Sequence, residues 1–345
     1  MSRAWRYALI ACAFLMVSGA AAVVWVGMRS LDEPVALAEP LRFKVASGWR
    51  FTRVASELAA QGVLVHPRAW VLYARWAHLA TAVKAGEYEI QPGTTPRELL
   101  TKIVNGQVLL HSFTIIDGWR VQDMLGALRR NPDIISTLGD TAPNLMDKLG
   151  LPGVDPEGQF LPETYRFVAN TTDIELLHQA HAALTRELDA AWAERDPDLP
   201  LRDSHELLIM ASIVQKESGL PQELGKIAGL YLHRLSIGMR LQADPTVIYG
   251  MGDRYEGDIR TVDLRTDGPY NTYTRAGLPP TPIALAGAAA IRATARPEKT
   301  DAIYFVASPK GDGSHVFSST LQKHNVAVAS YVAHQRRKAA GDGPR

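Results

Sequence analysis

The sequence predicts an α+β protein in three parts: an N-terminal transmembrane helix, a small β-α-α-β-α domain and a larger mixed α+β domain. Residues 7–28 form an uncharged, apolar run of 22 residues. Residues 41–107 switch between strand-like and helix-like periods in a compact order. The rest of the chain mixes both periods without the regular strand-helix alternation of a parallel sheet, which favours an α+β class.

Composition supports folded domains and excludes several classes of protein. The chain has 345 residues, of which 46% are hydrophobic and 21% charged, close to globular averages. Outside residues 1–30 it carries 34 basic and 36 acidic residues, a net charge of −2, so we expect no nucleic-acid partner. The single cysteine, Cys12, excludes an internal disulfide and a cysteine-rich metal site.

The apolar run from Tyr7 to Met28 is long enough to cross a bilayer. As a helix rising about 1.5 Å per residue it would span about 33 Å. Arg3 and Arg6 precede it, and the positive-inside tendency therefore predicts a cytoplasmic N-terminus and an exported remainder. The prediction is a single-pass membrane protein whose residues after about 30 lie outside the cytoplasm.

Three other interpretations of this run are weaker. A signal peptide cleaved after the small residues 20–22 would leave an apolar mature N-terminus, because the run continues to Val26. A lipoprotein box at residues 9–12 lacks a preceding apolar stretch. The length and terminal position of the run disfavour a helix buried in a soluble core. An uncleaved anchor is the favoured interpretation.

Residues 31–40 contain two prolines and predict a linker that lifts the following domain off the membrane. Within 41–107, a strand is expected near Leu41–Val45, helices after Gly48 and from Pro67, and a strand at 87–90. A capping box at residues 95–98 begins the third helix.

The larger domain is expected to occupy residues 108–335, with a C-terminal tail at 336–345. It opens with a β-rich segment at 108–116. Start and stop signals predict helices at 122–129, 144–149, 173–195 and 203–218, and strands at 302–307 and 315–317.

Missing motifs narrow the chemistry. No HExxH occurs, and no two of the ten histidines stand four residues apart as in that motif, so no metal is expected. Gly225-Lys226 is followed by Ile227 instead of a serine or threonine, which excludes a phosphate-binding loop. No GxSxG or SxxK motif is present either. No cofactor is expected, and catalysis by a carboxylate side chain is the remaining possibility.

Glu217 is the candidate acid. Met210, Ile213, Val214 and Glu217 share one helix face, so the glutamate extends an apolar stripe. Gly219 ends the helix just beyond, and both desolvation and the negative end of the helix dipole predict a raised pKa. Such a group suits general acid catalysis near neutral pH. These residues alone do not exclude a structural role for Glu217, either in a solvated pair with Lys216 or bonded to a distant arginine.

Two runs that look like loops, 233–250 and 269–282, follow the acid. They contain amides, hydroxyls and aromatics at the density suited to binding sugar rings. The candidate substrate-binding residues are Gln242, Asp244, Thr246, Tyr249, Tyr270, Asn271 and Tyr273. Ordinary polar loops with buried tyrosines explain these runs equally well.

The chain closely resembles the endolytic murein transglycosylases of the MltG/YceG-like family over nearly its whole length. The matching runs are EGQFLPETY at 157–165, MASIVQKES at 210–218, IGMRLQADPTVIYG at 237–250, YNTY at 270–273 and GLPPTPI at 277–283. The resemblance implies that Glu217 is the catalytic acid and that the protein is anchored in the bacterial inner membrane, facing the wall. It also implies peptidoglycan glycan strands as substrate and peptidoglycan synthases as partners.

Residues 41–107 resemble a LysM domain. Phe43-Lys44-Val45, Gly48 and Phe51 echo the start of the LysM pattern, but its Gly-Asp-Thr element is missing, because Trp49 and Arg50 follow Gly48. A glycan-binding role and a spacer role therefore both remain open for this domain.

The resemblance implies a lytic transglycosylase, which cleaves the bond between N-acetylmuramic acid and N-acetylglucosamine and leaves 1,6-anhydro ends on nascent strands during wall synthesis. Two alternatives remain. One is a two-carboxylate peptidoglycan hydrolase that uses Glu217 and Asp244. The other is a non-catalytic scaffold that binds the cell wall.

Overall fold

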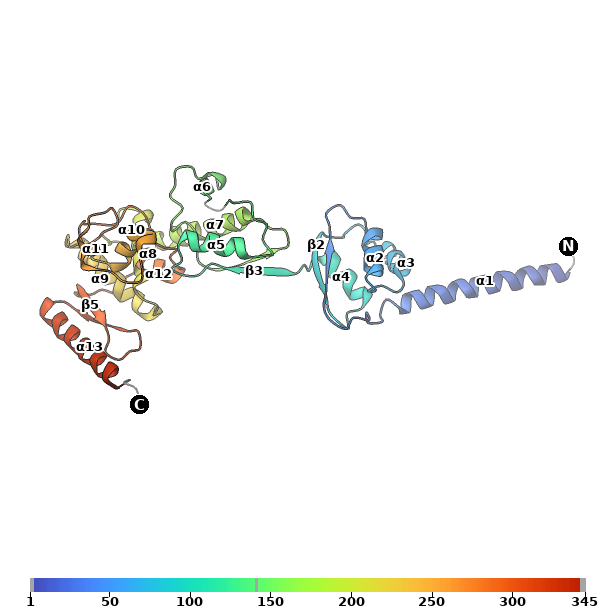
Figure 1. The fold of residues 1–345 in the computed structure, drawn as a ribbon. Coiled ribbons are helices and arrows are strands. Elements are labelled where there is room, and N and C mark those ends of the chain that lie inside the picture. Colours follow the sequence, from blue (N-terminus) through green and yellow to red (C-terminus); the bar gives the residue numbers. More distant parts are fainter. Residues whose placement is uncertain (1–2, 140–141, 342–345) are drawn as a thin grey trace. The chain divides into compact units, whose positions relative to one another are not determined.

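The structure is a computed structural model that describes residues 3–139 and 142–341. Its helices and two-stranded sheets confirm the mixed α+β class (Figure 1). The chain divides into two compact units. Unit 1 comprises Met1–His111 with Arg166–Asn170, and unit 2 comprises Ser112–Tyr165 with Thr171–Arg345.

The first helix, α1, runs from Arg3 to Arg29. Among the described residues, no helix has both the length and the apolar character of a membrane span. Part of the predicted span, Tyr7–Met28, lies outside the described side chains, namely residues 7–11, 13, 20, 23 and 24. Those that are described include Phe14 and Trp25, which are 71% and 62% exposed.

The rest of unit 1 has the predicted β-α-α-β-α order. Its elements are β1 (Leu41–Val45), α2 (Phe51–Ala60), α3 (Pro67–Trp76), β2 (Gly86–Ile90) and α4 (Pro96–Asn105). Strands β1 and β2 pair antiparallel, with Leu41 opposite Ile90. The predicted capping box is confirmed, because Thr95 and Glu98 exchange side-chain and backbone hydrogen bonds at the start of α4.

Aromatic and aliphatic side chains from all five elements form the core of unit 1. Trp70 is fully buried, stacks on Phe51 at 4.4 Å and donates its indole N–H to the Pro96 carbonyl at 2.8 Å. Each large side chain buried in this way contributes roughly 1.5–3 kcal/mol. Leu31 and Val35, from the segment predicted to be a linker, also lie in this core.

Unit 2 is mostly helical. Its elements are β3 (Leu110–Thr114), α5 (Val121–Arg130), α6 (Leu145–Lys148), β4 (Thr164–Val168), α7 (Asp173–Ala193), α8 (Ser204–Glu217), η1 (Pro221–Glu223), α9 (Leu224–Ser236), α10 (Asp244–Met251), η2 (Gly252–Arg254), α11 (Thr261–Arg265), α12 (Ala288–Ala295), β5 (Tyr304–Ala307), β6 (His315–Ser318) and α13 (Leu321–Gly341). Strands β3 and β4 pair with each other, and the division between the two units falls within both of them. The helices and strands predicted for this region are confirmed within a few residues. Helix α13 continues past residue 335, where the tail was predicted to begin, and residues 342–345 lie outside the described part.

The interpretation of residues 233–250 as a loop was wrong. The segment contains the end of α9 and all of α10. Pro245 lies in the first turn of α10, where its fixed φ favours a helix and its missing N–H costs nothing. The second run, 269–282, has neither helix nor strand, as predicted.

Helix α8 is the central element of unit 2 and packs against α7, α9, α10 and α12. Asp203 caps it, as predicted, by accepting a hydrogen bond from the Glu206 N–H at 2.9 Å. Every residue from Leu207 to Val214 is buried. The helix is therefore packed on all sides, so the side chains of its last turn are held in a fixed position.

Candidate active site

Glu217 is the last residue of α8. The apolar stripe predicted beneath it is confirmed, since Met210, Ile213 and Val214 are fully buried. The residue as a whole is half-buried, and its carboxyl group lies at the negative end of the helix dipole. Lys216 does not pair with it and instead donates to the Gly118 carbonyl at 3.2 Å.

Tyr231 of α9 is the hydrogen-bond partner of this acid. Its hydroxyl donates to Oε1 of Glu217 at 2.5 Å, and the tyrosine is 1% exposed. Burial raises the pKa of Glu217 to about 7, while the Tyr231 bond and the charge of Arg234 oppose the rise and the charge of Asp244 adds to it. Burial also raises the pKa of Tyr231 well above its ordinary value, which keeps its proton in place as a donor.

The acid lines a pocket of about 390 Å³. Residues from α8, α9, α10, α13, β5 and the loops beside them surround it, namely Glu217, Tyr231, Arg234, Gln242, Asp244, Tyr273, Tyr304, Phe305, Leu321 and His324. Phe305 lies edge-on to Tyr231, with ring centroids 6.0 Å apart. The pocket thus places two hydrogen-bonded acids, Glu217 and Asp244, beside aromatic rings, an arrangement suited to binding sugar rings.

Arg234, one turn after Tyr231 on α9, holds two walls of the pocket together. Its guanidinium donates to the Ile303 carbonyl at 2.7 Å, just before β5, and to the Leu241 carbonyl, just before α10. Burial lowers its pKa, and the positive charge favours an ionised Glu217. Replacing Arg234 would therefore disturb both the pocket walls and the electrostatics of the acid.

Asp244 and Gln242 stand at the opening of the pocket. Both are exposed, and Oδ1 of Asp244 accepts a hydrogen bond from the Tyr273 hydroxyl at 2.5 Å. Gln242 has a φ of 51°, a left-handed conformation that is uncommon for a residue other than glycine. Of the predicted substrate-binding residues, Gln242, Asp244 and Tyr273 share the pocket with Glu217.

Thr246 and Asn271 lie in the scaffold behind the pocket. Thr246 is fully buried, donates to the Ala243 carbonyl and bonds the Thr272 hydroxyl at 2.9 Å. Asn271 is 5% exposed and donates to three carbonyls of residues 263–266. These contacts position the loops around the site.

Tyr249 and Tyr270 belong to a second cluster, which includes a buried acid that the sequence did not predict as a site residue. Their rings lie 4.8 Å apart, and Glu157, 6% exposed, accepts from the Tyr249 hydroxyl at 3.3 Å and the Val121 N–H at 3.1 Å. Burial raises the pKa of Glu157 to about 7 against the effect of these bonds and of Arg120.

Five further side chains of the pocket were not predicted as site residues: Tyr231, Arg234, Tyr304, Phe305 and His324. The available signal was weak: Arg234 and Tyr304 lie in short runs, HRL and YFVA, without a chemical pattern of their own. In the described part of the chain, no group of three His, Cys, Asp or Glu side chains could hold a metal ion.

Comparison with known proteins identifies a family and relatives of this chain. The model of the YceG-like family matches residues 43–330. An endolytic murein transglycosylase of Bacillus subtilis (strain 168) is 29% identical over 330 residues, covering 90% of each chain. One of Streptococcus pneumoniae serotype 2 (strain D39 / NCTC 7466) is 25% identical over 323 residues, covering 84% of this chain and 58% of that protein.

A solved structure shows the same fold. The yceG-like protein of Listeria monocytogenes aligns with a TM-score of 0.50 at 24% identity, covering 83% of this chain and 98% of that chain. The family match spans most of the sequence, including α8 and every residue that lines the pocket around Glu217. On that match, the chain belongs to the YceG-like family.

Proposed function

We propose that this protein is an endolytic murein transglycosylase, a lyase that cleaves the bond between N-acetylmuramic acid and N-acetylglucosamine inside peptidoglycan strands. The observation that carries the proposal is the pairing of Glu217 with Tyr231 in an aromatic-walled pocket. A pKa of about 7 lets one carboxyl group act first as acid and then as base near neutral pH. The names of the relatives support the same reaction.

In the first step, protonated Glu217 gives its proton to the glycosidic oxygen. The bond from that oxygen to C1 of the muramic residue breaks, and the N-acetylglucosamine end leaves with a free hydroxyl. The carbonyl oxygen of the substrate's own acetamido group stabilises the positive charge at C1. Glu217 is now a carboxylate, and the Tyr231 hydroxyl, which donates to Oε1, stabilises its negative charge.

In the second step, the Glu217 carboxylate removes the proton from the C6 hydroxyl of the same muramic residue. O6 attacks C1, which closes the 1,6-anhydro ring and restores the protonated acid. No water is consumed, and the enzyme ends in its starting state. A single protein carboxyl group is therefore sufficient for both steps. Asp244, which accepts a hydrogen bond from the Tyr273 hydroxyl, orients either the substrate or the Tyr273 side chain.

The proposal includes a membrane anchor. The run from Tyr7 to Met28 carries no charge and follows Arg3 and Arg6, which supports insertion with the N-terminus in the cytoplasm and the pocket in the periplasm. This topology would bring the site to nascent strands made by peptidoglycan synthases. The LysM-like unit would hold the strand or act as a spacer.

Product analysis tests the function. The full chain in detergent is incubated with purified glycan strands, and the products are separated and weighed by mass spectrometry. We expect internal cuts that shorten long strands early, with new ends lighter by one water than reducing ends. New reducing ends would indicate the two-carboxylate hydrolase. Intact strands that cosediment with the protein would indicate the scaffold.

A further inference from the structure

Helix α3 presents an apolar stripe to solvent. Within the helix, Ala69, Leu72 and Trp76 follow one another at spacings of three and four residues, which places them on one helix face, and Val65 lies in the loop just before it. Val65, Leu72 and Trp76 are 79%, 65% and 75% exposed. The opposite face carries Trp70 and Ala74 into the core of unit 1. Single exposed apolar residues are ordinary, but a stripe of this kind indicates a contact surface.

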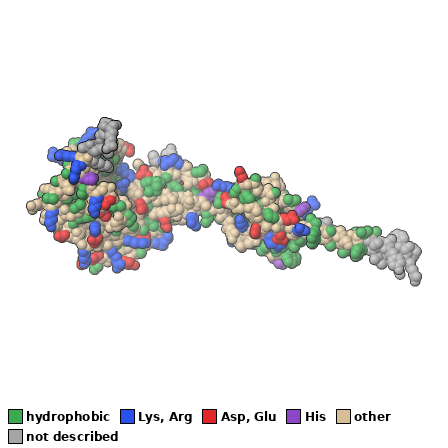
Figure 2. All heavy atoms as spheres, turned by 90° about the horizontal axis from the view of Figure 1, so that it is seen from below, with side chains coloured by type: hydrophobic (Ala, Val, Ile, Leu, Met, Phe, Trp, Pro, Cys, Tyr) green, Lys and Arg blue, Asp and Glu red, His purple; other side chains and the backbone are tan. Residues whose placement is uncertain are grey.

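The same segment has an unusual charge. Residues 63–84 contain no aspartate or glutamate, while Arg68 and Arg75 are exposed beside the stripe. Figure 2 shows hydrophobic side chains with basic ones beside them at the end of unit 1 from which α1 leaves. An apolar stripe flanked by arginines and free of acids matches a surface that is apolar inside and anionic outside.

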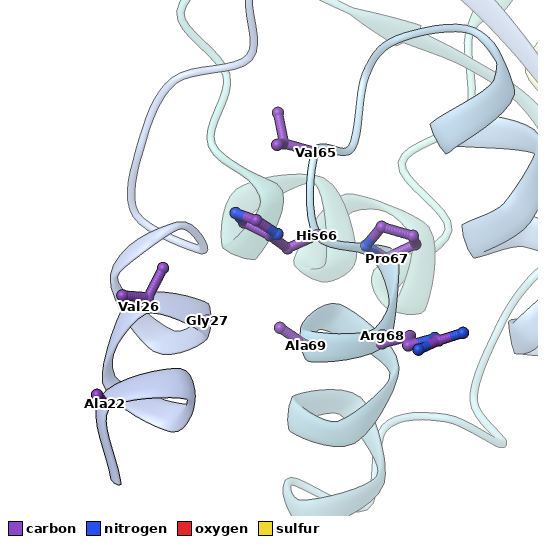
Figure 3. Close-up of a pocket in the computed structure, with 8 residues that line it drawn as sticks. All are labelled: Ala22, Val26, Gly27, Val65, His66, Pro67, Arg68 and Ala69. Carbon is purple, nitrogen blue, oxygen red and sulfur yellow. The ribbon is translucent and has the colours of Figure 1, made fainter. Parts of the chain in front are cut away.

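The stripe adjoins α1. A Cβ atom placed on Gly27 would lie 2.9 Å from the Cβ of Ala69, so α1 and α3 touch at this glycine. A groove of about 590 Å³ follows the contact and is lined by Ala22, Val26 and Gly27 of α1 and by residues 65–69 (Figure 3). The exposed face of α3 is therefore continuous with the exposed apolar surface of α1, where Val26 is 48% exposed.

We propose that the outer face of α3 docks on the surface of an anionic lipid bilayer. The inference rests on the proposed anchor, because α1 would bring that surface to α3. Trp76 and Leu72 would enter the interfacial layer, where tryptophan is favoured, and Arg68 and Arg75 would face anionic headgroups. Unit 1 would thereby be held against the membrane instead of swinging freely on its anchor.

Fluorescence quenching in vesicles tests the docking. The full chain with Cys12→Ala receives one reporter cysteine at a time: Leu72→Cys on α3, Val17→Cys on α1 or Ser56→Cys on α2. Val17 is 67% exposed and Ser56 is exposed in the same unit, so both are matched to Leu72 in accessibility. Each protein carries an environment-sensitive dye and enters vesicles of phosphatidylcholine and phosphatidylglycerol with nitroxide-labelled lipids.

We expect lipid nitroxides to quench the dyes at positions 72 and 17 and to leave the dye at position 56 close to its value without nitroxide. Quenching at 17 but not at 72 would overturn the docking while the anchor stands. Quenching at 72 but not at 17 would support the docking and reject the anchor. Quenching at neither would reject both. A dye at 72 that is shielded from water but unquenched by lipid would indicate a second copy or a protein partner and overturn the lipid assignment.

Two matched double variants test the role of the arginines beside the stripe. Arg68→Gln with Arg75→Gln should lower the ratio of docked to undocked protein about five-fold for each arginine removed. Arg42→Gln with Arg50→Gln removes the same charge from exposed positions elsewhere in unit 1 and should leave quenching at 72 unchanged. Equal losses in the two double variants would contradict specific docking through α3.

Discussion

The hydroxyl of Tyr231 reaches Oε1 of Glu217 across 2.5 Å, joining the middle of α9 to the end of α8. Two opposite effects meet at this carboxyl. Burial favours the protonated form, whereas the hydrogen bond and the nearby Arg234 favour the carboxylate. Burial is the larger effect, and the resulting pKa of about 7 allows both protonation states to be populated during turnover at neutral pH.

Replacing the acid should abolish most activity without unfolding the protein. Glu217→Gln keeps the size of the side chain but removes the proton that is transferred, so the cleavage rate should fall by about 10² to 10⁴ or more. Asp244→Asn is the matched amide control in the same pocket and should cost less. Rates on purified strands and thermal melting of both variants provide the measurement. Full activity in Glu217→Gln would remove the acid from the mechanism.

The Tyr231 hydrogen bond should be visible in the pH profile. Since the reaction begins with a protonated acid, kcat/KM should fall as pH rises through about 7. Tyr231→Phe removes a donor that stabilises the carboxylate, so the pKa of Glu217 should rise and this limb should move up by about one pH unit. A limb that stays in place would show that another group controls it.

Glu157 should destabilise the protein at neutral pH. Burial raises its pKa from 4.5 to about 7, so between these values the folded state keeps a proton that the unfolded state has lost. The free energy of unfolding then falls with rising pH, by up to about 1.4 kcal/mol per unit. Glu157→Gln cannot titrate and should lack this loss. Urea titrations from pH 5 to 8 compare the two proteins, and parallel pH dependence would contradict the prediction.

Glu223 should hold the hairpin of β5 and β6. It is 7% exposed and accepts from the backbone N–H of His315 at 2.8 Å and from its imidazole at 2.7 Å. Glu223→Ala leaves that N–H without its partner and should cost about 1–3 kcal/mol of unfolding free energy. Glu256→Ala removes an exposed pair with Arg260 and should cost less than about 1 kcal/mol. Equal costs by urea denaturation would overturn this role.

The sequence could predict features that depend on residues close to one another along the chain. Glu217 was found because one helix carries both the apolar stripe and the acid, and Gly219 marks its end. Tyr231 and Arg234 were missed because their roles depend on contacts with residues distant in sequence, such as Ile303 for Arg234. Helix α10 was mistaken for a loop because its eight residues are too few to show a clear period.

The sequence also could not show which of the predicted substrate-binding residues line the pocket and which lie elsewhere. Gln242 and Tyr249 are seven residues apart, yet one lines the pocket and the other contacts Glu157. A sequence does not show whether a hydroxyl or amide side chain faces the substrate or donates a hydrogen bond to a backbone carbonyl, as Asn271 does. Their burial, which only the fold sets, separates the two roles.

Cleavage in ¹⁸O-labelled water tests the single-carboxylate mechanism most directly. If the C6 hydroxyl attacks C1 and Glu217 serves as both acid and base, the new muramic ends contain no solvent oxygen and are lighter by one water than reducing ends. Mass spectra of products from the full chain should therefore show unlabelled 1,6-anhydro ends. New ends that carry one labelled oxygen would show that water attacks C1, which would contradict the transglycosylase mechanism and favour the hydrolase with Asp244.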